Sequence, residues 1–594
     1  MGDLLVKNID GKIVKLDFEK GETILKCLQR NNIPINAVCN GLGKCLKCKV
    51  IVYGDEAKKL HEDDKHTVLA CQTKLTKDTF IEIPSSSLLS TSPITMLGYE
   101  PPVQLDPPVK KIKLKIMLGP LREKRGNEIK ILKAVNKHGL KADGFHVGIR
   151  DTLLPLFDVA KDKITVTVRD NEIIHLEKGD EALKAYGVAV DIGTTQLSLF
   201  LVDLLSGCVI DFISELNKQE IFGGDVITRL SYIISKLGNF NLIRKITLDQ
   251  IKDVLNKLVK KNSVNPNHIY EIVVVGNTLM MHIFHGEDPS GLSRYPYKSS
   301  MIEARKIFAR NYGLNVNPLA KTYSPPNISG YIGADIAADI ISSEIYKSDK
   351  NILMMDIGTN TEIILRYDNK LYGCSTPSGP ALEGGHIKYG MRAEKGAIET
   401  VYIDPETLNI NYKTVGGVEP VGLCGSGVID AVVELVKIGA VKKDGSIDEK
   451  HKITSRINSG RAVIIAEKAN GEKITLSQED IREFQKAKAA IQAGYTTLLK
   501  YTNTQIEQIE EVIIAGSFGL HINLDSGRRL GIIPQVEDYK VKYLGNLAGA
   551  GARVLLKNIE TRKICEKIAG SIEYVELGQL KFFQDTWINS LYLS

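Results

Sequence analysis

The sequence predicts a multidomain protein that joins an α+β unit to α/β units. Short alternating strand patterns fill the first 83 residues, six prolines occur between residues 84 and 108, and strand and helix patterns alternate from residue 109 onward. A chain of 594 residues exceeds the usual size of one domain. We therefore expect an N-terminal domain at 1–92, a linker at 93–108, a small middle domain at 109–184 and a long domain at 185–594.

The composition is that of an ordinary globular protein, with 43 % apolar and 25 % charged residues. The net charge of 77 − 71 = +6 is spread over a long chain, so we expect no nucleic-acid partner. No stretch of 18 apolar residues is free of charge, which predicts no membrane span. Asp3 and Lys7 lie where a signal peptide needs an apolar run, so we expect a cytoplasmic protein.

The first 83 residues predict a small sheet packed on one helix. Two alternating runs flank Asp10-Gly11, a pair of residues that favours a hairpin turn. The following segment, ETILKCLQR, places Ile24, Leu25 and Leu28 at helical spacing. Three further short strands are predicted in CKVIVYG, TVLACQT and TFIEIP.

The linker and the middle domain follow from proline content and from periodicity. Proline fixes φ and removes a hydrogen-bond donor, so the proline-rich segment is expected to act as a semi-rigid spacer. In the middle domain, KIKLKI predicts a strand and EIKILKAVNKHG a helix, and a hairpin is expected around Asp170-Asn171.

The long domain contains an internal repeat. The segments YGVAVDIGTTQLSLFLVDL and NILMMDIGTNTEIILRYDN each place the sequence D-I-G-T between two apolar runs. Their aspartates, Asp191 and Asp356, are 356 − 191 = 165 residues apart. The repeat predicts two duplicated halves, each opening with a β-hairpin whose turn is D-I-G-T.

Four of the nine cysteines predict an iron–sulfur site. Their pattern is C-x5-C-x2-C followed by a fourth cysteine after 22 residues, at Cys39, Cys45, Cys48 and Cys71. Four thiolates suit a [2Fe–2S] cluster. Structural zinc is the alternative, but zinc sites usually contain two C-x2-C pairs and this segment contains one. The other five cysteines are expected to be buried apolar residues.

The cysteine loop, CNGLGKCLKC, resembles the β-grasp ferredoxins. Gly41 and Gly43 allow the backbone to approach a cluster closely. The first spacing is that of the adrenodoxin-like branch, and the gap before Cys71 is shorter than usual, which leaves the reduction potential open. Three lysines, Lys44, Lys47 and Lys49, form either a positive rim for an acidic partner or an ordinary solvated loop.

The two D-I-G-T turns predict phosphate binding. A carboxylate at the end of a strand can hold Mg²⁺, glycine lets the backbone approach a phosphate, and threonine offers a hydroxyl. We therefore expect Asp191 and Asp356 to bind Mg²⁺ with the phosphates. The residues expected to line the phosphates are Gly193, Thr194, Thr195, Gly358, Thr359 and Asn360.

A third glycine turn completes a nucleotide-site pattern. The segment EVIIAGSFGLH is a strand that runs into Gly516, Ser517 and Gly519, where an adenosine is expected to lie. A helix beginning near Gly333 connects the two repeats, and GLCGSG either lines the nucleotide or closes a helix–strand contact. There is no P-loop signature. This order of elements resembles the superfamily of acetate and sugar kinases, heat-shock chaperone ATPases and actin, which implies RNase-H-like halves that bind ATP.

The whole combination resembles the reductive activators of corrinoid-dependent enzymes. The strings that carry the resemblance are CNGLGKCLKC, VAVDIGTTQ, IFGGDVITRL, VVVGNTLMMH, GADIAADI, MMDIGTNTEI, GLCGSG, AGSFG and IEYVELG. The resemblance implies one-electron reduction of Co(II) to Co(I) on a partner corrinoid protein, through the [2Fe–2S] cluster and with ATP hydrolysis. It also implies a low-potential electron donor and a homodimer.

Two residues keep open roles. Asp225, in FGGDV, is a candidate for positioning the water that attacks ATP, or it is a helix N-cap. Asn277, in VVGNT, either reaches the nucleotide or caps the next helix. Three other functions are alternatives: an activator of a 2-hydroxyacyl-CoA dehydratase type of radical enzyme, a small-molecule kinase with a ferredoxin regulatory domain, and a plain electron carrier.

Overall fold

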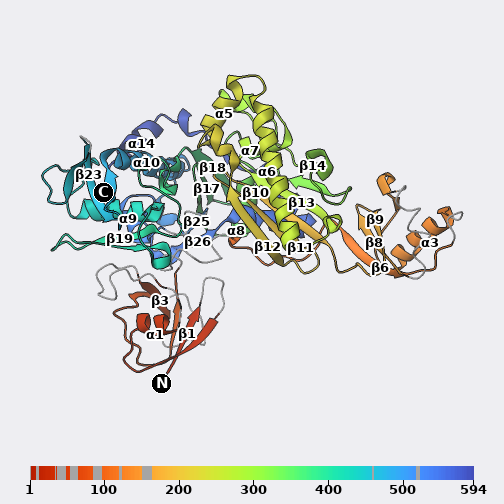
Figure 1. Ribbon diagram of the computed structural model, residues 1–594, viewed down its shortest axis with the longest axis horizontal. Helices are drawn as coiled ribbons and strands as arrows, with labels where there is room; N and C mark the ends of the chain where they lie inside the picture. The colour runs from red at the N-terminus through yellow and green to blue at the C-terminus, as the bar shows by residue number, and fades with distance from the viewer. Residues whose placement is uncertain are drawn as a thin grey trace. The chain divides into compact units, whose positions relative to one another are not determined.

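The chain forms two compact units, each assembled from segments that are distant in sequence. The first comprises Met1–Tyr99, Lys347–Asn546 and Glu573–Ser594, and the second comprises Glu100–Tyr346 and Leu547–Ile572. Figure 1 shows their elements in a computed structural model, coloured in chain order. The structure describes residues 2–7, 13–31, 33, 35, 48–53, 65–84, 97–119, 124–149, 163–457, 460–516 and 522–593.

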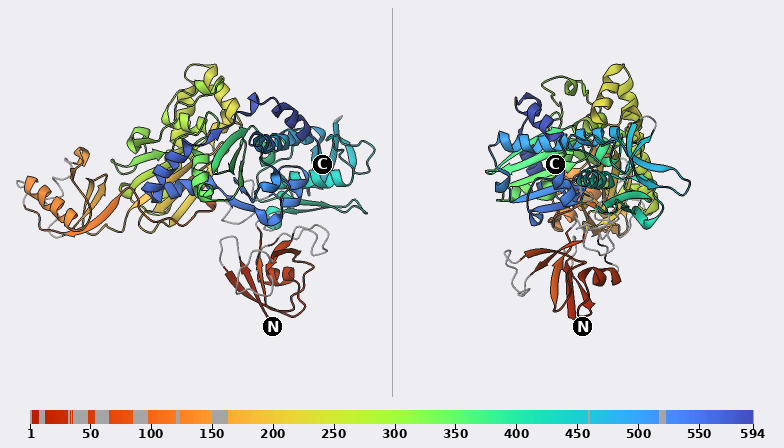
Figure 2. Two further views of the ribbon diagram at one scale, coloured as in Figure 1. Left: turned by 180° about the vertical axis from the view of Figure 1, so that it is seen from behind. Right: turned by 90° about the vertical axis from the view of Figure 1, so that its left-hand side faces the viewer.

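The N-terminal part of the first unit is a five-stranded mixed sheet with a helix packed on it. Figure 2 shows this sheet and its helix in red. The strand order is β2-β1-β5-β3-β4, with β1 antiparallel to β2 and parallel to β5. Its elements are β1 (Gly2–Lys7), β2 (Ile13–Phe18), α1 (Ile24–Arg30), β3 (Lys49–Tyr53), β4 (Lys65–Leu69) and β5 (Thr79–Glu82). The predicted helix residues Ile24, Leu25 and Leu28 are buried in this core. Asp10 and Gly11 lie outside the described residues.

The larger part of the first unit is built on a six-stranded sheet of order β26-β25-β16-β17-β18-β27. Its strands are β16 (Ile352–Ile357), β17 (Thr361–Tyr367), β18 (Lys370–Thr376), β25 (Glu511–Ala515), β26 (Val541–Gly545) and β27 (Glu573–Tyr574). Helix α10 (Gln478–Tyr501) packs on β17 and β18, and α14 (Phe583–Ser590) packs on α10. The smaller elements are β19 (Ala397–Ile403), β20 (Ile410–Thr414), β21 (Gly422–Leu423), α9 (Gly425–Lys437), β22 (Thr454–Ile457), β23 (Gly460–Glu467), β24 (Lys473–Ser477) and α11 (Leu524–Arg529).

The second unit contains the other six-stranded sheet, of order β12-β11-β10-β13-β15-β14. Its strands are β10 (Tyr186–Ile192), β11 (Gln196–Asp203), β12 (Val209–Leu216), β13 (Ile269–Gly276), β14 (Arg305–Phe308) and β15 (Lys321–Ser324). Helices α8 and α12 pack together against β10 and β13, and α6 packs on β11 and β12. The helices are α5 (Val226–Ser235), α6 (Asn239–Lys261), α7 (Thr278–His285), α8 (Ala334–Ser343), α12 (Leu547–Lys557) and α13 (Ile559–Ala569).

The two six-stranded sheets repeat one arrangement. In each, three consecutive strands form an antiparallel meander and the first of them pairs in parallel with a later strand. β10 pairs with β13, and β16 pairs with β25. The prediction of two duplicated halves, each opening with a hairpin, is therefore confirmed.

A smaller, four-stranded sheet of the second unit, here called the third sheet, is joined to the six-stranded sheet by buried ion pairs. The sheet is formed by β6 (Lys110–Lys115), β8 (Lys163–Arg169), β9 (Glu172–Lys178) and β7 (Gly144–Phe145), with helix α3 (Lys124–Lys137) beside it. Arg169 is buried and lies 2.6 Å from Glu271 on β13, and Glu271 also contacts Arg562 at 2.7 Å. Because both arginines share one carboxylate, removing Glu271 would leave two buried cations unpaired.

The segment predicted to be a linker is bound along most of its described length. The Tyr99 amide donates to the Leu544 carbonyl at 2.7 Å within the first unit. In the second unit, the Glu100 carboxylate pairs with Arg553 at 2.7 Å and with Lys557. Asp106 forms a parallel bridge with Asn558. These residues therefore find hydrogen-bond and ion-pair partners within the two units. The bounds of the linker stay a prediction.

Candidate functional site

The first D-I-G-T turn joins β10 to β11 in the second unit, where its backbone meets the end of a neighbouring strand. The register of β10 and β13 places Ile192 opposite Gly276. A Cβ on Gly276 would lie 2.7 Å from the Ile192 carbonyl oxygen, so only glycine allows this approach. The turn therefore requires glycine at two positions, Gly193 within the turn and Gly276 at the end of β13.

Two asparagines hold the first turn. The Asn217 side chain donates from Nδ2 to the Gly193 carbonyl at 2.8 Å, and its backbone amide donates to the Thr195 carbonyl at 2.9 Å. The Asn277 Nδ2 donates to the Thr194 hydroxyl at 3.0 Å. Both asparagines are at least nine-tenths buried. Their amides thus set the shape of the predicted phosphate-binding turn.

The second D-I-G-T turn joins β16 to β17 in the first unit and has the same kind of neighbour. Gly516, which follows β25, has φ +88°, and a Cβ there would lie 2.5 Å from the Ile357 carbonyl and 2.6 Å from Asp356 Oδ1. The structure thus brings together two predicted parts of the site, the Asp356 carboxylate and the start of the predicted adenosine turn. Ser517 and Gly519 lie outside the described residues.

The polar contacts of the second turn come from the segment after β18. The Ser378 hydroxyl donates to the Gly358 carbonyl at 3.0 Å, and the Gly379 amide donates to the Thr359 carbonyl at 2.8 Å. The Thr359 hydroxyl donates to Glu383 Oε1 at 3.2 Å. Glu383 ends a short 3-10 turn, Pro380–Glu383. A carboxylate therefore lies against this predicted phosphate-binding turn.

Four contacting residues did not appear among the predicted site residues: Asn217, Asn277, Ser378 and Glu383. Asn277 has a sequence signal, because EIVVVGN at 271–277 aligns with EVIIAGS at 511–517 and so belongs to the repeat. Asn217 and Ser378 each follow the third strand of a meander, which only the paired registers reveal. The structure shows the helix-cap role of Asn277, which caps α7 through Oδ1 and contacts Thr194 through Nδ2. Its contact with the nucleotide stays a prediction.

Asp225 is the N-cap of α5. Its side chain accepts a hydrogen bond from the Thr228 amide at 2.8 Å, and the Thr228 hydroxyl completes a capping box. The helix-cap alternative is thus observed directly. The role of Asp225 toward an attacking water stays a prediction.

The cysteine site is described for two of its four predicted ligands. Cys48, which is buried, directly precedes β3, and its carbonyl accepts from the Ala70 amide at 2.8 Å. Cys71 follows Ala70, so both thiols come from the same end of the β3–β4 pair. Two cysteines at one end of a strand pair fit the ligand set predicted for an iron–sulfur cluster. Cys39 and Cys45 lie outside the described residues.

Lys49 does not belong to a free positive rim. Its ammonium group lies 2.9 Å from Asp525 and 3.4 Å from Asp538, and Asp538 also pairs with Arg528. The charge of Lys49 is therefore neutralised within the first unit. Lys44 and Lys47 lie outside the described residues.

Four of the five other cysteines are buried, as predicted, and the exception is Cys208, which is exposed. Burial raises the pKa of the Cys374 and Cys565 thiols, which makes both groups unreactive. The GLCGSG segment forms a helix–strand contact, because a Cβ on Gly427 of α9 would overlap the Ile398 carbonyl of β19. Its contact with a nucleotide stays a prediction.

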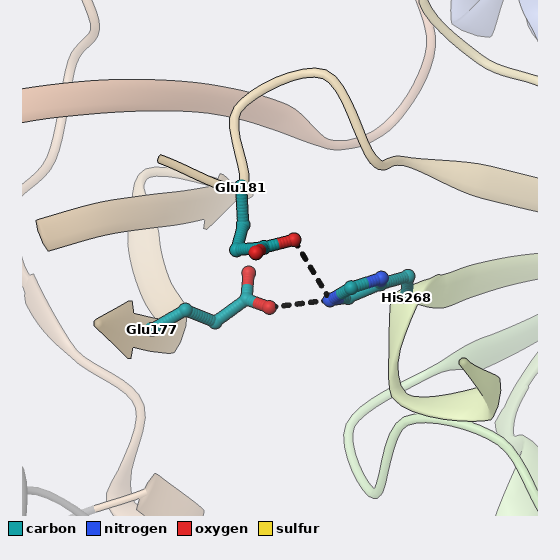
Figure 3. A group of neighbouring side chains, drawn as sticks. All are labelled: Glu177, Glu181 and His268. Carbon is teal, nitrogen blue, oxygen red and sulfur yellow. Dashed lines mark hydrogen bonds and ion pairs between the residues drawn. The ribbon is translucent and has the colours of Figure 1, made fainter. Parts of the chain in front are cut away.

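A separate cluster of metal-ligating side chains lies between the third sheet and the lobe of the second unit. Figure 3 shows Glu177, Glu181 and His268 pointing toward one another. The His268 Nε2 lies 2.5 Å from Glu177 Oε1 and 4.0 Å from Glu181 Oε2. Three such side chains are a ligand set that a divalent cation could use.

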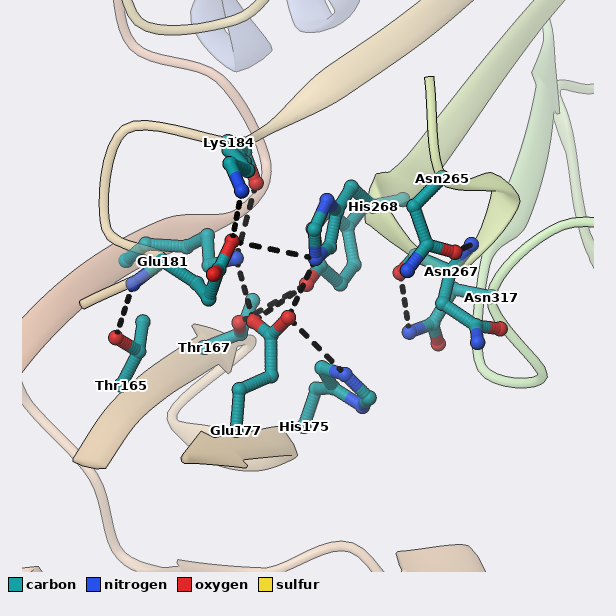
Figure 4. Close-up of polar contacts among 12 residues, drawn as sticks. Thr165, Thr167, His175, Glu177, Glu181, Lys184, Asn265, Asn267, His268 and Asn317 are labelled. Atoms are coloured by element: carbon teal, nitrogen blue, oxygen red, sulfur yellow. Dashed lines mark hydrogen bonds and ion pairs between the residues drawn. The ribbon is translucent and has the colours of Figure 1, made fainter. Parts of the chain in front are cut away.

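The carboxylates of this cluster already have cationic partners. Lys111, whose side chain is fully buried, lies 2.6 Å from Glu177, and Lys184 lies 2.7 Å from Glu181. Figure 4 shows how Lys184 and His175 surround the same group. Burial alone would raise the pKa of Glu177, but hydrogen bonds from His268 and Lys111 outweigh it and lower the pKa to about 2. We therefore interpret the cluster as a group of ion pairs, here called the ion-pair clamp, that connects the third sheet to the residues preceding β13.

Three family models match consecutive parts of the chain. The 2Fe-2S iron-sulfur cluster binding domain matches residues 7–76, the RACo middle region matches 186–348, and the C-terminal domain of RACo, the ASKHA domain, matches 350–594. The RACo middle region and the ASKHA domain together span the predicted long domain at 185–594. The boundary between these two family models lies between the two predicted hairpins. An N-terminal ferredoxin domain and an ASKHA-type ATP-binding fold are thus established, as the sequence predicted.

Relatives of known type align along nearly all of the chain. The corrinoid activation enzyme RamQ of Eubacterium limosum is 31 % identical over 571 residues, which cover 94 % of this chain and 93 % of RamQ. A solved structure titled reductive activator for corrinoid, iron-sulfur protein superposes with a TM-score of 0.76 and 30 % identity, covering 100 % of this chain and 98 % of the other. The chain belongs to the family of reductive activators of corrinoid proteins.

A more distant relative and a short one complete the comparison. The [Co(II) methylated amine-specific corrinoid protein] reductase of Methanosarcina barkeri is 25 % identical over 406 residues, 62 % of this chain and 70 % of that protein. The 2Fe-2S ferredoxin-5 of Aquifex aeolicus (strain VF5) is 32 % identical over 88 residues, 13 % of this chain and 88 % of the ferredoxin. Among the described residues, no helix has the length and apolar character needed to cross a membrane.

Proposed function

We propose that this protein uses ATP to reduce the inactive Co(II) form of a partner corrinoid protein to Co(I), passing one electron through its [2Fe–2S] cluster. The observation that carries the proposal is the presence, on one chain, of a ferredoxin domain and of two equivalent turns suited to phosphate. Each turn has a glycine neighbour and polar contacts at equivalent positions. These paired contacts support the proposal that each half contributes one turn to the binding of a nucleotide.

The proposal assigns roles to the predicted residues. Cys39, Cys45, Cys48 and Cys71 would hold the cluster, which supplies a one-electron carrier. Asp191 and Asp356 would bind Mg²⁺ with the phosphates, and Asp225 would position the attacking water. The glycine and hydroxyl-bearing residues of the turns would contact the phosphates, and Gly516, Ser517 and Gly519 would contact the adenosine. ATP hydrolysis, a low-potential donor and a homodimer are parts of the same proposal.

The energetics give the ATPase a task. A plant-type cluster commonly has a potential near about −400 mV. If the cobalt couple lies ~200 mV lower, the one-electron step is uphill by roughly 4.6 kcal/mol, at about 59 mV per tenfold change in equilibrium constant. Nucleotide binding can offset this only by favouring a complex in which the difference is smaller.

The dehydratase-activator alternative requires paired cysteines in the ATPase part. In the described part of the chain, Cys374, Cys424 and Cys565 are buried singly, and their Sγ atoms approach the backbone carbonyls of Gly494, Ile398 and Ala337. Iron content tests this directly: two irons per chain, lost in Cys45→Ala, agree with the proposal. Iron retained in that variant would favour the alternative.

The decisive experiment measures Co(I) by its absorbance. Anaerobically purified protein is mixed with a Co(II) corrinoid protein, a strong low-potential reductant and Mg-ATP. We expect Co(I) to form with the native chain and with Cys208→Ala, a control at the exposed thiol, and to be absent without ATP or with Cys45→Ala. Failure with several corrinoid proteins, despite an intact cluster and bound ATP, would overturn the proposal.

A further inference from the structure

The positive charge of the chain is not spread evenly. Residues 109–184 contain 17 basic and 11 acidic residues, a net charge of 17 − 11 = +6. The remainder contains 77 − 17 = 60 basic and 71 − 11 = 60 acidic residues and is neutral. Residues 124–141, which comprise α3 and the four residues after it, contain six basic residues and one acidic residue. The excess charge of the whole chain is therefore concentrated at one helix of the second unit.

The outer face of α3 carries a row of lysines. Figure 1 shows the helix in orange beside β6, which it contacts. Its inner face is formed by three buried residues: Asn127, Ile131 and Val135. Its outer face carries three exposed lysines, here called the lysine row: Lys130, Lys133 and Lys137. Residues three and four apart are neighbours on a helix, so these ammonium groups share one stripe of the surface.

The lysine row has no ion-pair partner among the described residues. Lysines of α6 show the contrast, because Lys257 pairs with Glu215 at 2.6 Å and Lys261 pairs with Asp211 at 2.8 Å. Like charges three or four residues apart destabilise a helix, so the row is unfavourable for α3 by itself. Solvated helices commonly alternate both signs of charge, and the outer face of α3 does not. An acidic surface opposite the row would compensate this repulsion.

The chemistry of the outer face fits a protein surface better than a polymer of phosphates. Arginine, the residue favoured for phosphate and nucleic-acid recognition, is absent from the row. α3 contains no aromatic residue on which a base could stack. Ile129, next to Lys130, is 45 % exposed and offers an apolar contact of the kind found in protein interfaces. The apolar residues that could enter a membrane, Ile131 and Val135, are buried within the unit.

We propose that the lysine row is a docking surface for an acidic face of the partner corrinoid protein. The inference rests on the proposed function and adds the surface through which this chain recognises its partner. Opposite charges across an interface raise the association rate more than they raise the final affinity. Salt screens exposed charges, so the contribution of the row falls as ionic strength rises. The row contains no predicted cluster ligand and no predicted nucleotide residue, so changing it leaves both sites in place.

Charge reversal in the full chain tests this surface. The row variant combines three substitutions: Lys130→Glu, Lys133→Glu and Lys137→Glu. The matched control makes the same change of net charge at three exposed lysines elsewhere in the second unit: Lys236→Glu, Lys245→Glu and Lys260→Glu. The probe is a Co(II) corrinoid protein that the native chain reduces to Co(I) with Mg-ATP. Surface plasmon resonance measures association and dissociation rates at about 50 mM and about 500 mM salt.

The expected effects are specific to the row. At low salt, the row variant associates about tenfold more slowly than the native chain, and the control less than about threefold more slowly. At high salt, the three proteins converge. Iron content and ADP affinity stay at the native values in both variants. A carbodiimide, which joins lysine amines to carboxylates, links the row to acidic residues of the partner in the native complex, and mass spectrometry identifies both ends.

Three results overturn the inference while the native chain still reduces the probe. The first is an equal loss of rate in the row variant and the control, which would reflect net charge alone. The second is an unchanged rate in the row variant. The third is binding of a DNA duplex or of anionic vesicles that is tighter than binding of the corrinoid protein and is lost in the row variant.

Two further measurements keep the outcomes distinct. Thermal unfolding shows whether the row variant folds; if it does not, the neutral variant with glutamine at the same three positions must slow association in the same direction, by less than charge reversal does, for the inference to hold. A native chain that neither binds nor reduces any corrinoid protein would overturn the proposed function, and the inference with it.

Discussion

The two D-I-G-T turns share their sequence and most of the residues that contact their backbone. They differ in the side chain that contacts the threonine hydroxyl. In each turn, a glycine of the neighbouring strand meets the isoleucine carbonyl, Gly276 at Ile192 and Gly516 at Ile357. In each, the segment after the third meander strand donates to the glycine carbonyl. The two halves therefore share both the close glycine contact of the turn and the side-chain hydrogen bond to its glycine carbonyl.

The difference lies at the threonine hydroxyls. The first turn is contacted by neutral amides and the second by the Glu383 carboxylate. A carboxylate beside a phosphate-binding turn repels a bare phosphate and favours a cation or a water molecule. The comparison teaches that the backbone of a repeat can be kept while one side chain from a distant segment changes the charge beside the turn.

The largest expected effect on stability comes from adding a Cβ at the glycines that contact the two turns, Gly516 and Gly276. Gly516→Ala combines a positive φ with two contacts below 3 Å, so it should lower the free energy of unfolding by about 2–5 kcal/mol. Gly276→Ala, which meets only the steric contact, should lower it by about 1–3 kcal/mol. Denaturant unfolding measures both.

Gly471→Ala is the matched control for backbone conformation, because Gly471 has φ +83° and open space around it. It should lower the free energy of unfolding by about 1–2 kcal/mol. If Gly516→Ala were no more destabilising than this control, the close approach to the Ile357 carbonyl would not contribute to stability. The prediction that both turns require a glycine at this contact would then be wrong.

The second prediction asks whether the first turn depends on the third sheet. Glu177→Gln leaves Lys111 without its charged partner and should lower the free energy of unfolding by about 3 kcal/mol. Because the pKa of Glu177 is lowered from 4.5 to about 2, its contribution is complete above pH 4.5 and is lost as the pH falls toward 2. The variant should lack this part of the pH dependence.

Unfolding curves between pH 2 and pH 6 check the effect, with Glu172→Gln at an exposed site of the same strand as control. Nucleotide affinity at neutral pH should stay unchanged, because the clamp lies outside the turn. An affinity loss matching the stability loss would mean that the third sheet supports the first turn and that the two halves differ in more than one hydroxyl contact.

The third prediction compares the side chains that hold the glycine carbonyls. Asn217→Ala removes the donor to Gly193 and the cap of the short helix Lys218–Phe222, so about 2 kcal/mol of stability should be lost. Ser378→Ala removes one hydroxyl and should cost about 1 kcal/mol. Asn267→Ala, at an exposed site, should stay within about 0.5 kcal/mol. Equal losses at Asn217 and Ser378 would contradict the extra capping role of Asn217.

Much of this arrangement could be predicted from local sequence patterns. Apolar runs around D-I-G-T fixed both hairpins, and the helical spacing of Ile24, Leu25 and Leu28 fixed α1, because each pattern contains its own structural cause. Asn277 also had a signal, in the likeness of EIVVVGN to EVIIAGS. The cysteine spacing was sufficient for the ferredoxin domain that the family models match.

Contacts made across long sequence separations could not be predicted. Glu383 is 24 residues from Thr359 and reaches it through a short turn that has no periodic pattern. Lys49 was expected to face solvent or a partner, but its charge is neutralised by Asp525, 476 residues away. The linker prediction came from prolines alone, and nothing local shows that Glu100 meets Arg553. Such pairs depend on tertiary packing, which periodicity does not record.

The smallest expected effect separates two roles of Asp225, which lies in the same unit as the first turn. Asp225→Asn keeps a side-chain acceptor for the Thr228 amide, so stability should change by a few tenths of a kcal/mol at most, whereas Asp225→Ala should lose about 1 kcal/mol with the cap. The predicted role in positioning water requires ATP turnover to fall in both variants. If turnover falls in neither, Asp225 only caps α5, and the proposed hydrolysis depends on the other carboxylates, Asp191 at the first turn and Asp356 at the second.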